Sequence, residues 1–104
     1  MNVLKFRTIG QTLFPESDLS NMVAGSENYY EAEFNCDETW NGMARVAMFI
    51  TDDATEYQPL TNNRCFIPTN ILKNTKIFVS LIGQSGGSRI QTNPIVIRQK
   101  KGGL

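Results

Sequence analysis

Hydrophobic and polar positions alternate along most of the chain, and this pattern predicts short β-strands. Alternation with a period of two puts every second side chain on one face of a strand. The clearest example is residues 29–36, where Tyr30, Ala32, Phe34 and Cys36 share a face. By the same reasoning we expect strands at 2–9, 29–36, 43–51, 56–60, 64–67, 76–82 and 89–98.

The segment 76–82 differs from the others because it is apolar on both faces. Ile77, Val79 and Leu81 point one way, and only Ser80 interrupts the other face. A strand of this kind is covered on both sides, so we expect it in the middle of a sheet.

Prolines and short polar stretches predict where strands end. Pro59 marks 56–60 as an edge strand, and Pro68 ends the strand that begins at Arg64, since proline donates no backbone hydrogen bond. Residues 69–74 predict a polar corner, and Asn93-Pro94 predicts an interruption in the last strand.

These elements predict an all-β fold. No segment shows the period of a long helix, and seven strands joined by turns indicate a single domain over residues 1–104. We expect an Ig-like antiparallel β-sandwich of about seven strands, with a small β-barrel as the alternative.

Two segments fall outside the strand pattern. Residues 11–28 predict a long loop or arm, and long loops in compact domains are often functional. Its apolar side chains either cap one end of the sandwich or bind a partner; they are Leu13, Phe14, Leu19, Met22 and Val23. The polar, glycine-containing residues 99–104 predict a flexible tail.

Charge is balanced in total but segregated along the chain. Ten acidic and ten basic residues give a net charge of zero, which does not favour nucleic acid as a partner. All ten acids lie at or before Glu56, where the net charge is −7, and the remainder carries +7. Either oppositely charged strands pair across the surface, or the molecule docks onto a charged neighbour or another copy of itself.

The N-terminal residues contain no apolar run of signal-peptide length, and no stretch has the length of a membrane span. We therefore expect folding in a cytoplasm. Cys36 and Cys65 are then expected as reduced, packed thiols, with a disulfide as the alternative.

Candidate chemistry is sparse. The chain has no histidine, so the commonest general base and metal ligand is absent. Asp52, Asp53 and Glu56 lack the alternating spacing of a calcium loop, and the pair Glu31 and Glu33 is typical of a solvated sheet face. We expect no catalytic residues, no cofactor, no metal and no enzymatic activity.

Exposed aromatic rings supply the main alternative to a protein-binding role. Tyr29, Tyr57 or Trp40 could stack on a carbohydrate if they lie on the surface. Trp40 is expected in the core instead, where it would anchor the sandwich.

Four motifs in order resemble a known family. They are GSENYY (25–30) before Phe34, WNG (40–42) before AMF (47–49), CFIP (65–68) before IL (71–72), and VSLIG (79–83) before IQTNP (90–94). This order resembles small Ig-like modules in structural proteins of phages that infect Gram-positive bacteria, including the N-terminal domain of baseplate upper proteins and related tail, fibre and head-associated proteins.

The resemblance implies a non-enzymatic virion protein. Its partners would be the major capsid protein or tail and baseplate proteins, with homo-oligomerisation possible, and its location would be the virion surface as a capsid decoration, head-fibre base or tail adaptor. A carbohydrate- or receptor-binding β-sandwich is the alternative function.

Overall fold

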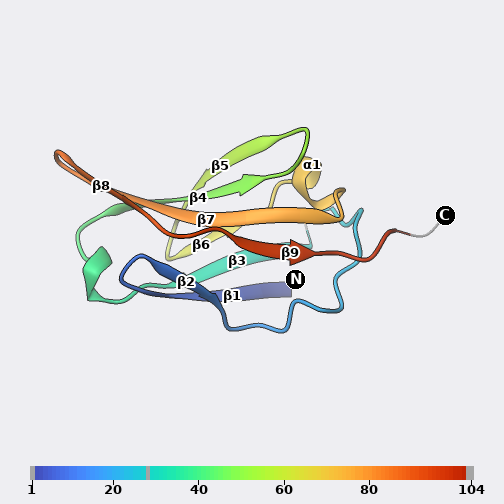
Figure 1. Cartoon of the computed structure of the whole chain (residues 1–104), viewed down its shortest axis with the longest axis horizontal. Helices are drawn as coiled ribbons and strands as arrows, with labels where there is room; N and C mark the ends of the chain where they lie inside the picture. The colour runs from blue at the N-terminus through green and yellow to red at the C-terminus, as the bar shows by residue number, and fades with distance from the viewer. Residues whose placement is uncertain (1, 28, 103–104) are drawn as a thin grey trace.

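Two β-sheets pack face to face in the computed structural model, which describes residues 2–27 and 29–102. The first sheet has the order β2 (Thr12–Pro15), β1 (Asn2–Ile9), β3 (Tyr30–Asn35) and β6 (Arg64–Phe66). The second has the order β5 (Thr55–Pro59), β4 (Ala44–Ile50), β7 (Lys76–Ser85) and β8 (Ser88–Gln91), with β9 (Ile95–Arg98) also paired to β7. A short 3-10 helix, Glu38–Trp40, and the one-turn helix α1 (Thr69–Leu72) lie in the connections. Figure 1 shows the two layers running along the long axis of the molecule.

The all-β sandwich is confirmed, with nine strands in the described residues instead of about seven. One additional strand is β2, which lies in the segment expected to be a loop. The other arises because the last predicted strand is divided into β8 and β9 at the expected Asn93-Pro94 interruption. At this break the Thr92 hydroxyl accepts a hydrogen bond from the Leu81 amide at 2.9 Å, which keeps the chain attached to β7.

Strand β2 forms because Gly10 and Gln11 make a two-residue turn. Gly10 has φ of +56°, which glycine adopts without strain, and the chain then pairs antiparallel with β1 from Ile9↔Thr12 onward. Pairing turns Leu13 into the core, where it is 2% exposed.

The first sheet contains one parallel pair, which departs from the expected antiparallel arrangement. Strands β1 and β3 run side by side in the register Leu4↔Ala32 and Phe6↔Phe34. The Phe6 and Phe34 rings stack with their centroids 5.1 Å apart. A parallel pair needs a connection that crosses from one end of the sheet to the other, and residues 16–27 supply most of it.

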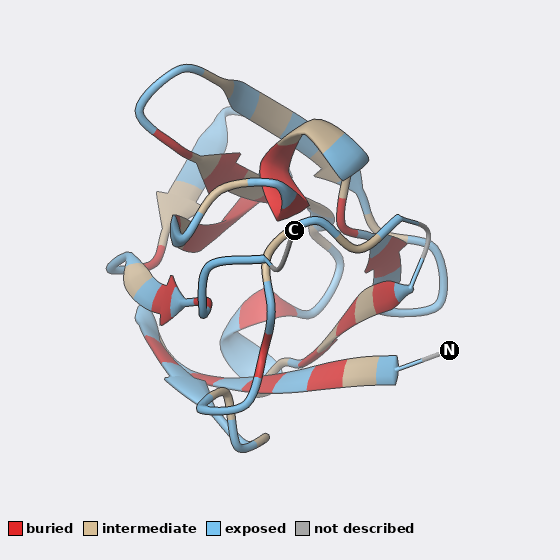
Figure 2. Cartoon of the chain, turned by 90° about the vertical axis from the view of Figure 1, so that its right-hand side faces the viewer, coloured by how far each residue is buried: buried red, intermediate tan, exposed pale blue. Residues whose placement is uncertain are grey.

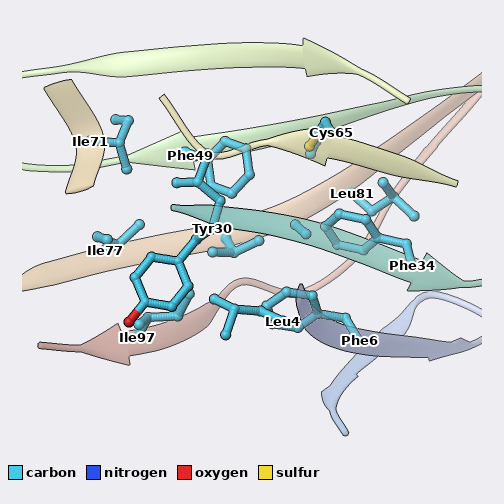
Figure 3. Close-up of a cluster of buried hydrophobic side chains, with 14 of the residues drawn as sticks. Leu4, Phe6, Tyr30, Phe34, Phe49, Cys65, Ile71, Ile77, Leu81 and Ile97 are labelled. Atoms are coloured by element: carbon cyan, nitrogen blue, oxygen red, sulfur yellow. The ribbon is translucent and has the colours of Figure 1, made fainter. Parts of the chain in front are cut away.

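The core lies between the sheets and follows the predicted alternation. Figure 3 shows Leu4, Phe6 and Phe34 from the first sheet meeting Phe49, Ile77 and Leu81 from the second. In Figure 2, buried and exposed stripes alternate along strand β1. Ile71 and Leu72 of α1 are fully buried, so the corner after Pro68 adds two apolar side chains to the core.

The C-terminal segment is more ordered than expected for a flexible tail. Gln99 is 5% exposed, and its Nε2 donates hydrogen bonds to the carbonyls of Leu72 at 2.9 Å and Asn74 at 2.7 Å. The Lys100 amide donates to the Met22 carbonyl at 2.8 Å. These contacts fix residues 99 and 100; residues 103–104 lie outside the described part of the chain.

Trp40 is buried, as expected, and its ring packs directly on the backbone of β7. It is fully buried, and its Nε1 donates a hydrogen bond to the Gly10 carbonyl at 2.8 Å. A Cβ atom at Gly83 would lie 2.7 Å from the Trp40 ring and 2.9 Å from the Met43 sulfur. The position therefore accepts glycine and excludes every larger residue unless the core shifts.

We predict that Gly83→Ala destabilises the fold by about 1–3 kcal/mol, the usual cost of overpacking a filled core. Urea unfolding monitored by Trp40 fluorescence measures the change. Gly87→Ala is the matched control, because nothing lies within 4 Å of its added Cβ, and we expect little change there. Equal stability of the two variants would contradict the close packing of Trp40 on β7.

Candidate functional site

The outer face of the second sheet is apolar, although it faces away from the core. Ala47 and Phe49 of β4 point inward and are fully buried, so Met48 and its alternate neighbours on β4 point outward. We define the apolar outer face by the outward side chains of β4, β5, β7 and β9: Val46, Met48, Ile50, Tyr57, Pro59, Phe78, Ile82 and Val96.

These side chains form continuous rows across the strands. In one row Val46 stands opposite both Pro59 and Ile82, and in a second row Ile50 stands opposite Phe78. Phe78 in turn stands opposite Val96 on β9. The rows are contiguous, whereas isolated surface hydrophobes are commonplace and need no explanation.

Exposure varies across this face: Ile82 and Ser80 are 8% and 2% exposed, whereas the edges on β5 and β9 are open to solvent. Tyr57 is 57% exposed and Val96 is 38% exposed, while Met48 and Phe78 are partly buried by their lateral neighbours. The sequence predicted that β7 is covered on both faces; within the described residues, packing against the other sheet covers one of them. The second face therefore has the character of a docking surface.

Ser80 lies in the middle of the apolar outer face. It is 2% exposed, and its Oγ has no hydrogen-bond partner among the described residues. A buried hydroxyl without a partner costs about 1–3 kcal/mol.

Charged residues border the face at one end of its strands. Lys76 stands opposite Arg98 at the start of β7, and both are exposed. The β4–β7 pairing ends at Ile50↔Phe78, and Asp52 and Asp53 follow at the same end of the face, in the turn from β4 to β5. The end of the face thus changes from acidic on the β5 side to basic on the β9 side.

The partner-binding residues proposed from the sequence do not form one surface. Leu13 and Met22 are 2% and 3% exposed and belong to the core, and Leu19 packs against that core. Phe14 and Val23 are 37% and 44% exposed, but Phe14 is on β2 whereas Val23 is paired with Lys100. The sequence left open whether these residues cap the sandwich or bind a partner. The buried residues cap the sandwich, and partner binding stays a prediction for Phe14 and Val23.

A hollow lies at the seam between the edge strands β5 and β6. It has a volume of about 420 Å³ and includes Glu31, Gln58, Arg64 and Phe66 in its lining. The two strands are joined by a tight turn in which Asn62 and Asn63 both have positive φ. Phe66 is 52% exposed at the rim of this hollow.

Rings suited to carbohydrate stacking are partly available. Tyr29 is 46% exposed, and Tyr57 is exposed within the apolar outer face, but the burial of Trp40 removes it from this role.

The acidic candidates are engaged separately from one another. Glu33 forms an ion pair with Arg64 at 2.8 Å, which is one instance of the cross-strand pairing expected from the charge pattern. Asp53 accepts a hydrogen bond from the Thr51 hydroxyl, and Glu56 accepts one from the Asn70 amide. Over residues 2–27 and 29–102, no three His, Cys, Asp or Glu side chains gather where they could hold a metal ion.

Both cysteines are free thiols, which agrees with the expectation of reduced, packed side chains. Burial, and secondarily the nearby Glu31 carboxylate, raises the pKa of the Cys65 thiol to about 12. Burial also raises the pKa of Cys36. Neither thiol is activated as a nucleophile, because nucleophilic cysteines have lowered pKa values.

Comparison with known protein families gives no match to this chain, and comparison with curated proteins gives no significant relative. In the part of the chain that the structure describes, no helix is both long enough and apolar enough to cross a membrane.

We predict that Leu13→Ala and Met22→Ala each lower the free energy of unfolding by about 2–5 kcal/mol, because they leave cavities in the core. Phe14→Ala and Val23→Ala are matched exposed controls and should change it by less than about 1 kcal/mol. Thermal and urea unfolding test this division. An unchanged unfolding midpoint for Leu13→Ala would contradict the assignment of Leu13 to the core.

We also predict that Cys65 makes stability fall between pH 9 and 12. The folded thiol keeps its proton through this range, whereas the unfolded thiol loses it near the ordinary cysteine pKa of 9.0. The unfolded state then binds fewer protons, so the contribution is present below pH 9 and is lost as pH rises through the folded pKa. Urea unfolding from pH 8 to 11 should show a shallower decline for Cys65→Ala than for the unsubstituted chain, and equal slopes would exclude this contribution.

Proposed function

We propose that this chain is a non-enzymatic structural subunit that assembles with other protein subunits through its apolar outer face. The observation that carries the proposal is the contiguous row structure of that face on the central strands β4 and β7. Phe78, Met48 and Ile50 lie on these central strands, and interface residues away from the rim lose most of their contact with water on binding.

Physical magnitudes favour docking over permanent exposure. Burying apolar surface contributes about 25 cal/mol per Å² removed from water. A partner that covers the face would gain this contribution for the exposed apolar side chains, which include Tyr57 and Val96. The bordering charges would orient the partner, because charged rims determine register and the rate of encounter.

A structural role accords with the chemistry of the chain. The sequence has no histidine, and the cysteine thiols have raised pKa values. The acidic side chains of Glu33, Asp53 and Glu56 are engaged by Arg64, Thr51 and Asn70 in separate places.

We propose the bacteriophage virion as the assembly in which this subunit acts. The support is the resemblance of four ordered motifs to modules of phage structural proteins, which implies the major capsid protein or a tail or baseplate protein as a further partner in the particle. Two of these motifs, AMF (47–49) and VSLIG (79–83), lie on β4 and β7 and contribute Met48, Ser80 and Ile82 to the outer face.

We predict that the chain co-purifies with phage particles banded in a density gradient, and that Phe78→Asp removes it from them. The introduced charge opposes burial of the face in an interface. Phe66→Asp is the control: it makes the same change at an exposed position on the other sheet and should leave incorporation intact. Mass spectrometry of the banded particles measures the amount, and circular dichroism verifies that both variants fold. Particles that band without the unsubstituted chain would refute the virion role.

A further inference from the structure

We propose that a second copy of this chain covers the apolar outer face, in a twofold dimer whose axis lies between the two faces and runs along β4 and β7. The inference rests on the proposed function in taking this face as the docking surface, and it identifies the occupant. Three properties of the face support self-association in this orientation: the placement of its charges, the shape of its edges and its area.

The charges select the direction of the axis. Rotation about an axis parallel to the strands exchanges the β5 side of one copy with the β9 side of the other, at the same end of the strands. The acidic turn at Asp52 and Asp53 of one copy then lies at the same end as Lys76 and Arg98 of the other. Because the operation is twofold, this placement occurs twice, and the segregated charges become complementary.

The other twofold arrangement brings like charges together. An axis in the plane of the face but perpendicular to the strands exchanges the two ends of each strand. Arg98 of one copy would then approach Arg89 of the other, since β9 and β8 lie end to end along the same edge of β7. Asp52 would meet the neutral end of β4 near Ala44.

The edges of the face are complementary in shape under the strand-parallel axis. Tyr57 on β5 stands opposite Met48, which stands opposite Ser80 on β7. On the other edge of β7, Ser80 stands opposite the break between β8 and β9. The exposed Tyr57 ring of one copy therefore lies over the break in the edge of the other.

The centre of the face repeats this complementarity. Ser80 is small and Met48 is long and adaptable, and the rotation places Met48 of each copy over Ser80 of the other. Ile50 and Phe78 stand at one level of the face, so each copy's phenyl ring meets the isoleucine of the other. Sheets that pack face to face in this manner lie about 10 Å apart with aligned strands.

The area indicates a weak dimer. Strand spacing and residue rise give the face a footprint on the order of 20 by 23 Å, and two copies bury on the order of 900 Å². Stable complexes bury about 1,200–2,000 Å², so this interface falls in the range of weak specific contacts. Dimerisation is accordingly expected to depend on concentration.

Sedimentation velocity of the purified chain from about 5 to about 500 µM tests the dimer, because this range brackets weak interfaces of that size. The sedimentation coefficient should rise from the monomer value toward the dimer value. Phe78→Asp should weaken association by about tenfold or more. Val96→Asp should do the same, and because Val96 is exposed on β9 this change is not expected to disturb folding. A chain that remains monomeric throughout this range overturns the inference.

A charge-exchange series tests the axis. Asp53→Lys and Arg98→Asp should each weaken the dimer about three- to tenfold, and the chain carrying both changes should recover most of the loss, since the pairs are reciprocal. Arg89→Asp is the control and should have little effect; strengthening by Arg89→Asp without recovery in the double variant would indicate the perpendicular axis and refute this arrangement.

The result is separable from the proposed function. If the chain is monomeric while Phe78→Asp still prevents incorporation into particles, a different protein covers the face and the dimer is wrong. If the chain dimerises as described but is absent from particles, the dimer stands and the virion role is wrong.

Discussion

Strand β7 is hydrogen-bonded along both edges, and the rest of the sandwich depends on this double pairing. Strand β4 occupies one edge over seven residue pairs, and β8 followed by β9 occupies the other. The backbone of a strand paired on both edges is shielded from water, so only its side chains contact the core on one face and the surroundings on the other. Its inward side chains, Ile77, Val79 and Leu81, are fully buried against the first sheet, and Gly83 admits the Trp40 ring.

The same strand links the core to the docking surface. Because side chains alternate, each residue that β7 contributes to the core is followed by one on the outer face. A change in strand register would exchange the two sets, which makes the position of Phe78 and Ile82 as strictly determined as that of Val79 and Leu81. The apolar outer face is therefore held rigidly by the core packing beneath it.

The period-two pattern was sufficient to predict most of the fold. It placed Tyr30, Ala32 and Phe34 on one face, which is the buried one, and the interruption at Asn93-Pro94 was visible as a proline in a strand. Strand β2 was missed because its four residues carry one inward apolar side chain, Leu13, and pairing is decided by the turn at Gly10. The order at Gln99 was missed because its polar side chain is buried by carbonyls of Leu72 and Asn74, which are distant in sequence.

The site was harder to predict than the fold. The signal was present in the apolar character of both faces of β7 and in the alternate residues of β4, but sequence alone does not show which face the first sheet covers. The apolar residues of 11–28 left two uses open, capping the sandwich or binding a partner, because their segment lacks a period. Met22 shows how the first arises, since an irregular segment can place single side chains in the core while its backbone runs over the surface.

Links between the two ends of the chain have a consequence for how the molecule folds. The Asn93 side chain accepts a hydrogen bond from the Leu13 amide, and the Gln11 side chain donates one to the Gln91 carbonyl, each joining residues 80 positions apart. The first sheet can gather β1, β3 and β6 early in synthesis, but this seam closes after β8 has emerged. Loop-closure entropy must be overcome before such distant contacts form, which makes folding slow and all-or-none. A ribosome-bound chain that ends before residue 93 would lack the acceptor for the Leu13 amide, so this seam would stay open until the C-terminal strands emerge.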